Sequence, residues 1–355
     1  MRTSPSRLSW VLRRSALLVA VLTAVAATAA CGGTGSSGSG DHKVTVYSAD
    51  GLDAWYRTQF DKFEQQTGIA VDVVVAGSGE VVNRLEKEQS NPQADLVVTL
   101  PPFIQKADAA GLLQPLGVDT SAFDPAEKDP NGKFVSLAGN YLSFIANSTV
   151  DASKLTWDDL LKPEYKGKLQ YSTPGQAGDG TAVLILLQQL RGKTGALDYL
   201  KQLQVNNVGP SASTGKLQPK VDKGELLIAN GDVQMNMESI ATKGSTFSIF
   251  FPASADGKRH TIAVPYFLGL AKGAPHTEAA TELMEFLLSK EVQQTLGPDA
   301  FAVSARTDLR DAPAGGSGPT PAALVQGVEI VRPDWNKVLA DLDADLDAYN
   351  TAIGG

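Results

Sequence analysis

The sequence predicts an α/β protein whose folded body has two lobes. Strand and helix patterns alternate along the chain from Lys43, and the same alternation starts again near Gly167. Strands that alternate with helices form parallel sheets with right-handed crossovers. The body covers residues 43–355, whereas a single hydrophobic core stops growing at about 250–300 residues. Two lobes with separate cores are therefore the expected arrangement.

The first half predicts three strands joined by two helices. Valine-rich runs at residues 44–47, 69–75 and 95–98 have the composition of buried strands. Between them, apolar side chains recur at helical spacing at residues 52–63 and 81–88. In such sheets, ligands bind at the carboxyl ends of the strands. Those ends carry three hydroxyl side chains, Ser48, Ser78 and Thr99.

The second half predicts a similar series, followed by a return to the first lobe. A strand at residues 261–270 is expected to make that return. A proline- and glycine-rich loop is predicted at residues 312–321. The other predicted elements are strands at 167–171, 226–229 and 233–236, the last ending at Met237-Glu238-Ser239, and helices at 182–190, from about 213 to 223, at 278–288 and at 335–349.

Three predicted helix starts carry hydroxyl or glycine residues: Ser78-Gly79, Asp179-Gly180-Thr181 and Ser213-Thr214-Gly215. Unpaired backbone N–H groups and the helix dipole make such a start an anion site. Each one alone is equally explained as a cap that stabilises its own helix by about 1 kcal/mol. Their joint occurrence after strands favours an anion-binding site.

The N-terminal segment predicts export and lipidation. Four arginines precede the apolar run Ala16–Ala30, which is typical of a secretory signal. Thr28-Ala29-Ala30-Cys31 resembles a lipobox, although Thr28 replaces the usual large aliphatic residue. Lipidation of Cys31 would anchor the chain to a membrane, and residues 32–40 read as a flexible linker. An ordinary cleaved signal peptide at residues 1–30 is the alternative.

The composition excludes several functions. Without residues 1–30 the chain has 27 basic and 39 acidic residues, because four of the 31 basic residues lie in the signal. This acidic balance argues against nucleic acid as a partner. Cys31 is the only cysteine, so neither a disulfide within the chain nor a cysteine metal cluster can form.

Enzyme and cofactor motifs are also missing from the sequence. Gly77-Ser78-Gly79 lacks the third glycine of a dinucleotide loop, since Val82 stands there. In the P-loop-like stretch 209–216, Leu217 follows where a magnesium ligand is needed. No Gly-x-Ser-x-Gly motif occurs, and the three histidines are far apart. We expect neither catalysis, nor a cofactor, nor a metal site.

Several stretches resemble the solute-binding lipoproteins of ABC importers. They include VYSADGL (46–52), AGSGEVVNRL (76–85), TPGQAGDGTA (173–182) and NNVGPSASTGKLQPKVDKGEL (206–226). The resemblance is to the iron(III), polyamine and phosphonate branch, and within it to the 2-aminoethylphosphonate-binding proteins. It implies a type II periplasmic-binding fold: two α/β lobes, joined by two crossover segments, close on a solute.

The resemblance also implies an organisation and partners. The expected parts are a signal peptide (1–30), a lipidated cysteine and linker (31–42), the first lobe (43–140 and 263–355, with the C-terminal helices) and the second lobe (141–262). The protein would be an extracytoplasmic, membrane-anchored monomer that delivers 2-aminoethylphosphonate to the permease subunits of an ABC importer.

Such a ligand needs donors for its phosphonate and a carboxylate for its ammonium group. The candidate donors are Ser48, Ser78, Gly79, Thr99, Thr181, Ser213, Thr214 and Gly215. The candidate carboxylates are Glu238, as first choice at a predicted strand end, then Asp50 and Asp179. Each acid could equally be a helix cap or a solvated loop charge.

Three alternatives remain at this point. An iron(III) site of this branch uses two adjacent tyrosines, and none of the eight tyrosines has a tyrosine neighbour. A polyamine binder would need more aromatic and acidic residues. A surface-anchored enzyme that processes phosphonates would need a nucleophile–base pair or a metal cluster.

Overall fold

The computed structural model describes residues 42–309 and 319–354. The predicted signal peptide and Cys31 lie outside this range, as does most of the predicted 312–321 loop. Within it, no helix combines the length and apolar character that a membrane crossing requires.

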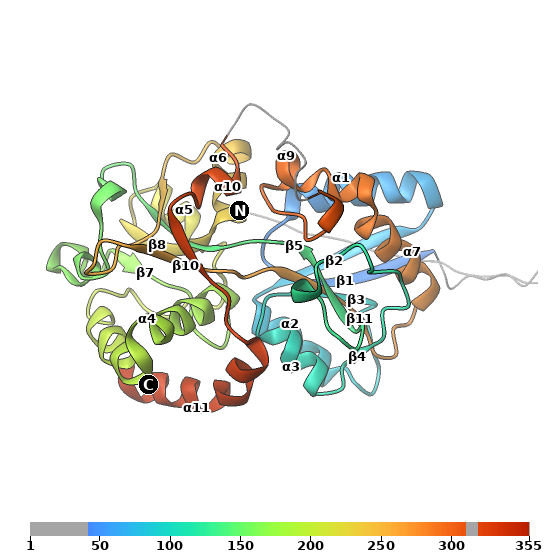
Figure 1. The fold of residues 1–355 in the computed structure, drawn as a ribbon, viewed down its shortest axis with the longest axis horizontal. Helices are drawn as coiled ribbons and strands as arrows, with labels where there is room; N and C mark the ends of the chain where they lie inside the picture. The colour runs from blue at the N-terminus through green and yellow to red at the C-terminus, as the bar shows by residue number, and fades with distance from the viewer. Residues whose placement is uncertain (1–41, 310–318, 355) are drawn as a thin grey trace, which may run out of the picture. The chain divides into compact units, whose positions relative to one another are not determined.

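The first lobe is built on a six-stranded sheet (Figure 1). Its order is β2-β1-β3-β11-β4, and β5 pairs with β11. Strand β1 is parallel to both β2 and β3, as the sequence predicts, whereas β11 runs antiparallel to its neighbours. The strands are β1 (Lys43–Ala49), β2 (Ala70–Ala76), β3 (Leu96–Thr99), β4 (Leu113–Gln114), β5 (Phe134–Ala138) and β11 (Tyr266–Ala271).

Helices cover both faces of this sheet (Figure 1). Neighbouring residues of β1 show why: Val46 packs in the core that contains Trp55 and Leu283, and Tyr47 packs in the core that contains Val82. Alternate side chains of a strand point to opposite faces, so both faces of the sheet are apolar. The helices are α1 (Asp53–Thr67), α2 (Ser78–Lys87), α3 (Phe103–Ala109), α7 (Thr277–Leu288), α8 (Lys290–Gln293) and α9 (Leu296–Ala300).

The second lobe is built on a four-stranded sheet of order β7-β8-β6-β9. Its core contains Trp157, which meets Phe144 and Tyr199 edge to face. The elements are β6 (Leu142–Ala146), β7 (Leu169–Gln170), β8 (Ile228–Asp232), β9 (Ser248–Phe250), α4 (Gly178–Leu203), α5 (Gln218–Asp222) and α6 (Val233–Lys243). Short 3-10 helices lie at Pro125–Glu127, Ala152–Lys154, Asp159–Leu161, Pro163–Tyr165 and Thr307–Leu309.

Two adjacent crossover segments connect the lobes. Residues 139–141 lead from β5 to β6, and residues 263–265 lead from β10 (Arg259–Ile262) to β11. The N–H of Val264 donates to the carbonyl of Asn140 at 2.9 Å. The prediction of one continuous strand at 261–270 is therefore wrong, because the crossover that contains Pro265 divides it.

Two more predicted elements need correction. Residues 233–236, predicted as a strand, form the first turn of α6. Asp232 is the N-cap of that helix, and its carboxylate accepts from the N–H of Met235 at 2.7 Å. The helix predicted from residue 213 begins only at Gln218, so Ser213-Thr214-Gly215 lies in the preceding turn.

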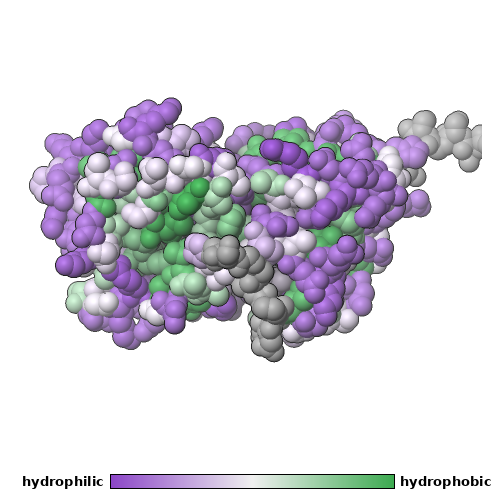
Figure 2. Space-filling model, turned by 90° about the horizontal axis from the view of Figure 1, so that it is seen from above, coloured by the Kyte–Doolittle hydropathy of each residue, from purple (hydrophilic) through white to green (hydrophobic). Residues whose placement is uncertain are grey.

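The C-terminal part of the chain packs on both lobes. Helix α11 (Trp335–Ile353) lies along α4 and reaches α3 (Figure 1). The hydroxyls of Tyr349 and Tyr171 are 2.9 Å apart in this contact. Before it, β12 (Val328–Val331) pairs with β10, and α10 (Pro321–Leu324) packs against α6. Figure 2 shows that hydrophilic residues cover much of the face seen from above, with a hydrophobic area on the side of the second lobe.

Candidate ligand-binding site

Two buried carboxyl groups and a half-buried one converge where the lobes meet. Asp50 follows β1 in the first lobe, whereas Asp179 in α4 and Asp232 at the end of β8 belong to the second. Asp179 and Asp232 are 3% and 0% exposed. Asp179 interacts electrostatically with both of the others. The sequence predicts Asp50 and Asp179 as candidates, and the structure brings them together.

Asp179 is the least satisfied member of this cluster. Its Oδ1 has no hydrogen-bond partner within the described part of the chain. Burial raises the pKa of Asp179 well above its usual value, and the charge of Asp232 adds to this effect, while a hydrogen bond with Thr214 acts against it. A buried carboxylate without a cation is costly. The cluster therefore favours a positively charged partner.

The two other acids are held by neighbours from both lobes. The hydroxyl of Ser213 donates to Asp50 Oδ2 at 2.6 Å. Burial raises the pKa of Asp50, and the Ser213 hydrogen bond opposes that shift. Burial also raises the pKa of Asp232 to about 6, against the hydrogen bond from Met235. The hydroxyl of Tyr266 lies 3.0 Å from the Asp50 carbonyl and 3.4 Å from Asp232 Oδ2.

The starts of α2 and α4 meet beside these acids. The N–H of Gly79 donates to the carbonyl of Gln176 in the second lobe at 3.0 Å. A Cβ atom on Gly178 would lie 2.6 Å from the Ser78 hydroxyl oxygen. Two helix N-termini thus face each other across the lobes, and their dipoles favour an anion there.

The other predicted donors have mixed environments. Thr99 Oγ1 donates to the Ser78 carbonyl at 3.2 Å, next to the α2 start. Ser48 donates to the Ala49 carbonyl, and Thr181 donates to Ala177 and accepts from Gly175, so these two hydroxyls serve local backbone groups. Thr214 Oγ1 donates to Ser172 at 3.0 Å, and Gly215 forms a backbone hydrogen bond with Asp50.

Glu238, the predicted first-choice carboxylate, contributes its charge to the environment of Asp232, but its own oxygens are hydrogen-bonded to other groups. Its Oε1 accepts from the N–H of Ala54 in α1, and its Oε2 accepts from Gln234 Nε2. The wrong prediction of a strand at 233–236 explains why Glu238 was the first choice. It placed the expected strand end at residue 237, whereas the strand ends at Asp232. Sequence reasoning therefore missed Asp232. The available signal was the residue type, because aspartate is one of the preferred N-cap residues and Asp232 directly precedes the segment that forms α6.

Two further polar residues extend the cluster without any signal in the sequence. Asn230 Oδ1 accepts from the N–H of Ser172 at 2.8 Å, and its Nδ2 donates to the Ser172 hydroxyl at 3.0 Å. The Ser172 hydroxyl also accepts from Thr214 Oγ1 at 3.0 Å, so Ser172 connects Asn230 to the turn that contains Thr214. Strands β7 and β8 make this possible, since they place the two segments side by side.

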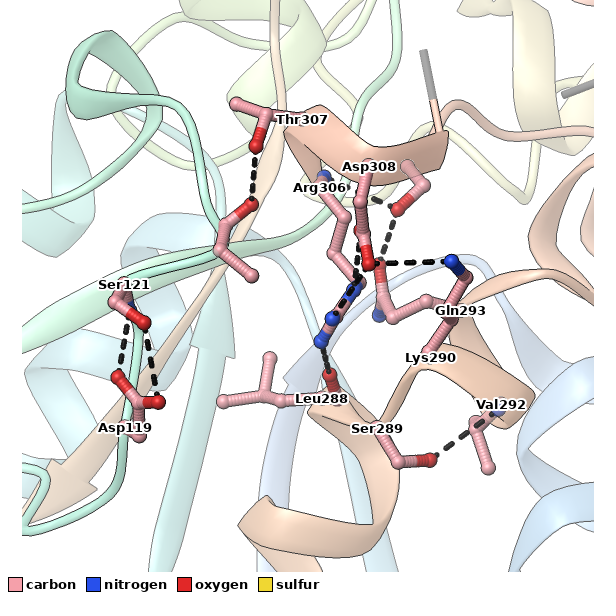
Figure 3. Close-up of polar contacts among 12 residues, drawn as sticks. Asp119, Ser121, Leu288, Ser289, Lys290, Val292, Gln293, Arg306, Thr307 and Asp308 are labelled. Atoms are coloured by element: carbon pink, nitrogen blue, oxygen red, sulfur yellow. Dashed lines mark hydrogen bonds and ion pairs between the residues drawn. The ribbon is translucent and has the colours of Figure 1, made fainter. Parts of the chain in front are cut away.

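A cavity of about 560 Å³ lies elsewhere, along the crossover residues Tyr141 and Pro265. None of the predicted ligand residues, all within the described ranges, lines it. Its wall includes Arg306, whose guanidinium is bound by Asp308 and by the carbonyl of Leu288 (Figure 3). We therefore place the candidate site at the acid cluster and the two helix starts.

Comparison with solved structures identifies the fold. The fold matches that of the periplasmic binding protein P5PA with a TM-score of 0.72 and 21% identity, over 88% of this chain and 100% of that one. It matches the ferric binding protein from Campylobacter jejuni with a TM-score of 0.69 and 22% identity, over 87% and 99%. The chain has the type II periplasmic-binding fold, as the sequence predicts.

The sequence assigns the family. Residues 44–299 match the family of bacterial extracellular solute-binding proteins, and the chain belongs to it. A Salmonella typhimurium protein named "Putative 2-aminoethylphosphonate-binding periplasmic protein" is 45% identical over 313 residues, which cover 86% of this chain and 91% of that protein.

Proposed function

We propose that this protein captures 2-aminoethylphosphonate outside the cytoplasm and delivers it to the permease of an ABC importer. The observation that carries the proposal is the cluster of Asp50, Asp179 and Asp232, in which Asp179 Oδ1 is buried and has no hydrogen-bond partner in the described structure. An ammonium group supplies the positive charge and the N–H donors that this cluster needs. The similarity to the Salmonella protein supports the same ligand.

The phosphonate would bind at the starts of α2 and α4. Ser78 and Gly79 in the first lobe, and the backbone N–H groups at the start of α4 in the second, would approach it from opposite sides, while the carboxylate of Asp179 would face the ammonium group. The remaining predicted donors, Ser213, Thr214 and Gly215, lie next to Asp50 and Ser172. We assign these three to the junction between the phosphonate and the amine.

Two other ligands with the same fold fit the chain less well. Iron(III) would be held by adjacent tyrosines in this branch, and the sequence contains no such pair. A polyamine has several ammonium groups and no anionic group, so it would bring no negative charge to the helix dipoles at the starts of α2 and α4. The third alternative, a surface enzyme, would need a nucleophile activated by a base. We propose a binding role without catalysis.

The cellular setting is part of the proposal. Cys31 would be lipidated after removal of residues 1–30, and the chain would act as a monomer tethered by its linker. The lobe boundaries proposed after residues 140 and 262 (43–140, 141–262 and 263–355) fit a hinge at the two crossover segments. However, α10, β12 and α11, which the sequence assigned to the first lobe, pack on α6, β10 and α4 of the second. The permease subunits of the importer would be its membrane partners.

Isothermal titration calorimetry tests the ligand. The purified protein is unfolded and refolded to remove any carried solute, and is then titrated with 2-aminoethylphosphonate, ethylphosphonate, inorganic phosphate, spermidine and iron(III) citrate. We expect saturable binding of 2-aminoethylphosphonate, and binding at least about tenfold weaker for ethylphosphonate and phosphate, because an unpaired buried charge costs about 1.5–3 kcal/mol. Heat with spermidine or iron alone would refute the ligand.

A further inference from the structure

Helix α1 begins without a capping side chain of its own. Its N-cap residue is Leu52, which has left-handed backbone angles (φ 62°, ψ 11°) and whose side chain offers no cap within the described chain. The first N–H groups of a helix need acceptors from outside that helix. The N–H groups of Leu52 and Ala54 therefore depend on another part of the protein.

The second lobe supplies these acceptors. Oε1 of Gln234 accepts from the N–H of Leu52 at 3.3 Å, and Oε1 of Glu238 accepts from the N–H of Ala54 at 3.3 Å. Both side chains belong to α6, four residues apart, and so lie on one face of that helix. They are 0% and 5% exposed. One face of α6 thus caps a helix of the opposite lobe.

Gln234 makes further hydrogen bonds at this contact. Its Nε2 donates to Glu238 Oε2 at 2.8 Å and to the carbonyl of Ala300 at the end of α9 at 3.0 Å. Its Oε1 also lies 3.4 Å from the hydroxyl of Tyr266. Nε2 and Oε1 of Gln234 therefore both take part in hydrogen bonds. Because some of the partners belong to the first lobe, the buried side chain keeps all of these hydrogen bonds only while the two lobes are in contact.

Charge also favours this contact. The carboxylate of Glu238 faces the N-terminus of α1, the positive end of the helix dipole. Lys243, at the other end of α6, attracts Asp53 in the first turn of α1. Hydrogen bonds and charges therefore both hold α6 against α1.

We propose that Gln234 and Glu238 form a latch that holds the lobes closed and slows the release of bound solute. This rests on the proposed solute-binding function, and it assigns Glu238 to closure rather than to the ammonium group of the ligand. Binding proteins of this fold open by hinge motion, which would separate α6 from α1 and break the contacts. Differences in affinity between related complexes lie mostly in the dissociation rate.

Binding kinetics test the latch with Glu238→Ala. We expect the dissociation constants for 2-aminoethylphosphonate and ethylphosphonate to rise by the same factor, about 3- to 30-fold. Stopped-flow tryptophan fluorescence should place the change for 2-aminoethylphosphonate in the dissociation rate. Glu238→Gln keeps an acceptor oxygen and should give a smaller effect, and Glu282→Ala, at an exposed glutamate of α7, should give none. A loss confined to 2-aminoethylphosphonate would overturn the proposal.

Hydrogen exchange tests the latch independently of the ligand. In the absence of added solute, the peptide that contains Leu52 and Ala54 should exchange faster in Glu238→Ala than in the wild type or in Glu282→Ala, because its amides lose an acceptor. Equal exchange rates in all three proteins would overturn the latch. If the wild type bound none of the titrated solutes, the proposed ligand would be refuted. The exchange rates would still test whether Glu238 holds α6 against α1.

Discussion

Asp179→Asn is expected to weaken the binding of 2-aminoethylphosphonate by about 1.5–3 kcal/mol, the contribution of a hydrogen bond to a charged group. The asparagine keeps the size of the side chain but removes the charge that would pair with the ammonium group. Calorimetry should show the loss for 2-aminoethylphosphonate and a change below about 0.5 kcal/mol for ethylphosphonate, which has no amine. Equal losses for both ligands would remove Asp179 from the ammonium site.

The stability of Asp179→Asn provides a control, because a misfolded variant would be less stable. Burial and the neighbouring Asp232 raise the folded-state pKa of Asp179, so the folded wild type binds more protons than the unfolded chain. The wild type should therefore lose stability as the pH rises through the raised folded-state pKa, and the variant should lose less. Without solute, Asp179→Asn should melt higher than the wild type at pH 7.5, and this difference should shrink toward pH 5.

Asp232 contributes to the pH dependence that remains in the variant. Its folded-state pKa of about 6 lies above the unfolded value because of burial. Its contribution to stability is therefore present at acidic pH and is lost as the pH rises through about 6. A melting temperature that rose from pH 5 to 7.5 in wild type and variant alike would contradict the buried-acid cluster.

Gly77→Ala is expected to block lobe closure without unfolding either lobe. Its own backbone tolerates a side chain, with φ −66° and ψ 150°. The nearest atoms to a new Cβ belong to the second lobe: the carbonyl oxygen of Ala212, and that of Gln176 at 2.8 Å. Overpacking of this kind costs about 1–3 kcal/mol, and here that cost applies only to the closed state.

Calorimetry and thermal unfolding separate these effects. The affinity of Gly77→Ala for 2-aminoethylphosphonate should fall about 5- to 150-fold, while its thermal unfolding without solute should remain cooperative, because the substitution repacks neither lobe. Gly297→Ala in α9 is the matched control, because a Cβ there meets no atom of the described structure within 4 Å. Unchanged affinity in Gly77→Ala would show that the α2 start does not approach the second lobe when solute binds.

Local sequence patterns were sufficient to predict most helices and strands of the first lobe. The helical recurrence of apolar residues around Trp55 and the valine-rich run of β2 depend on neighbours in sequence, and both elements form where predicted. The failure at residues 233–236 has a local cause as well. Val233-Gln234-Met235-Asn236 alternates apolar and polar residues as a strand does, but the Asp232 cap starts a helix there.

By itself, the sequence determined the alternation of strands and helices, the fold class and the hydroxyl- and glycine-rich starts of α2 and α4, because each depends on residues close together in the chain. Only the tertiary structure decided which acids share a site. Asp50, Asp179 and Asp232 come from three distant segments, and their pKa values are raised by burial in the folded protein. It also decided that Glu238 caps α1, since a carboxylate pairs with whichever donor packing places beside it.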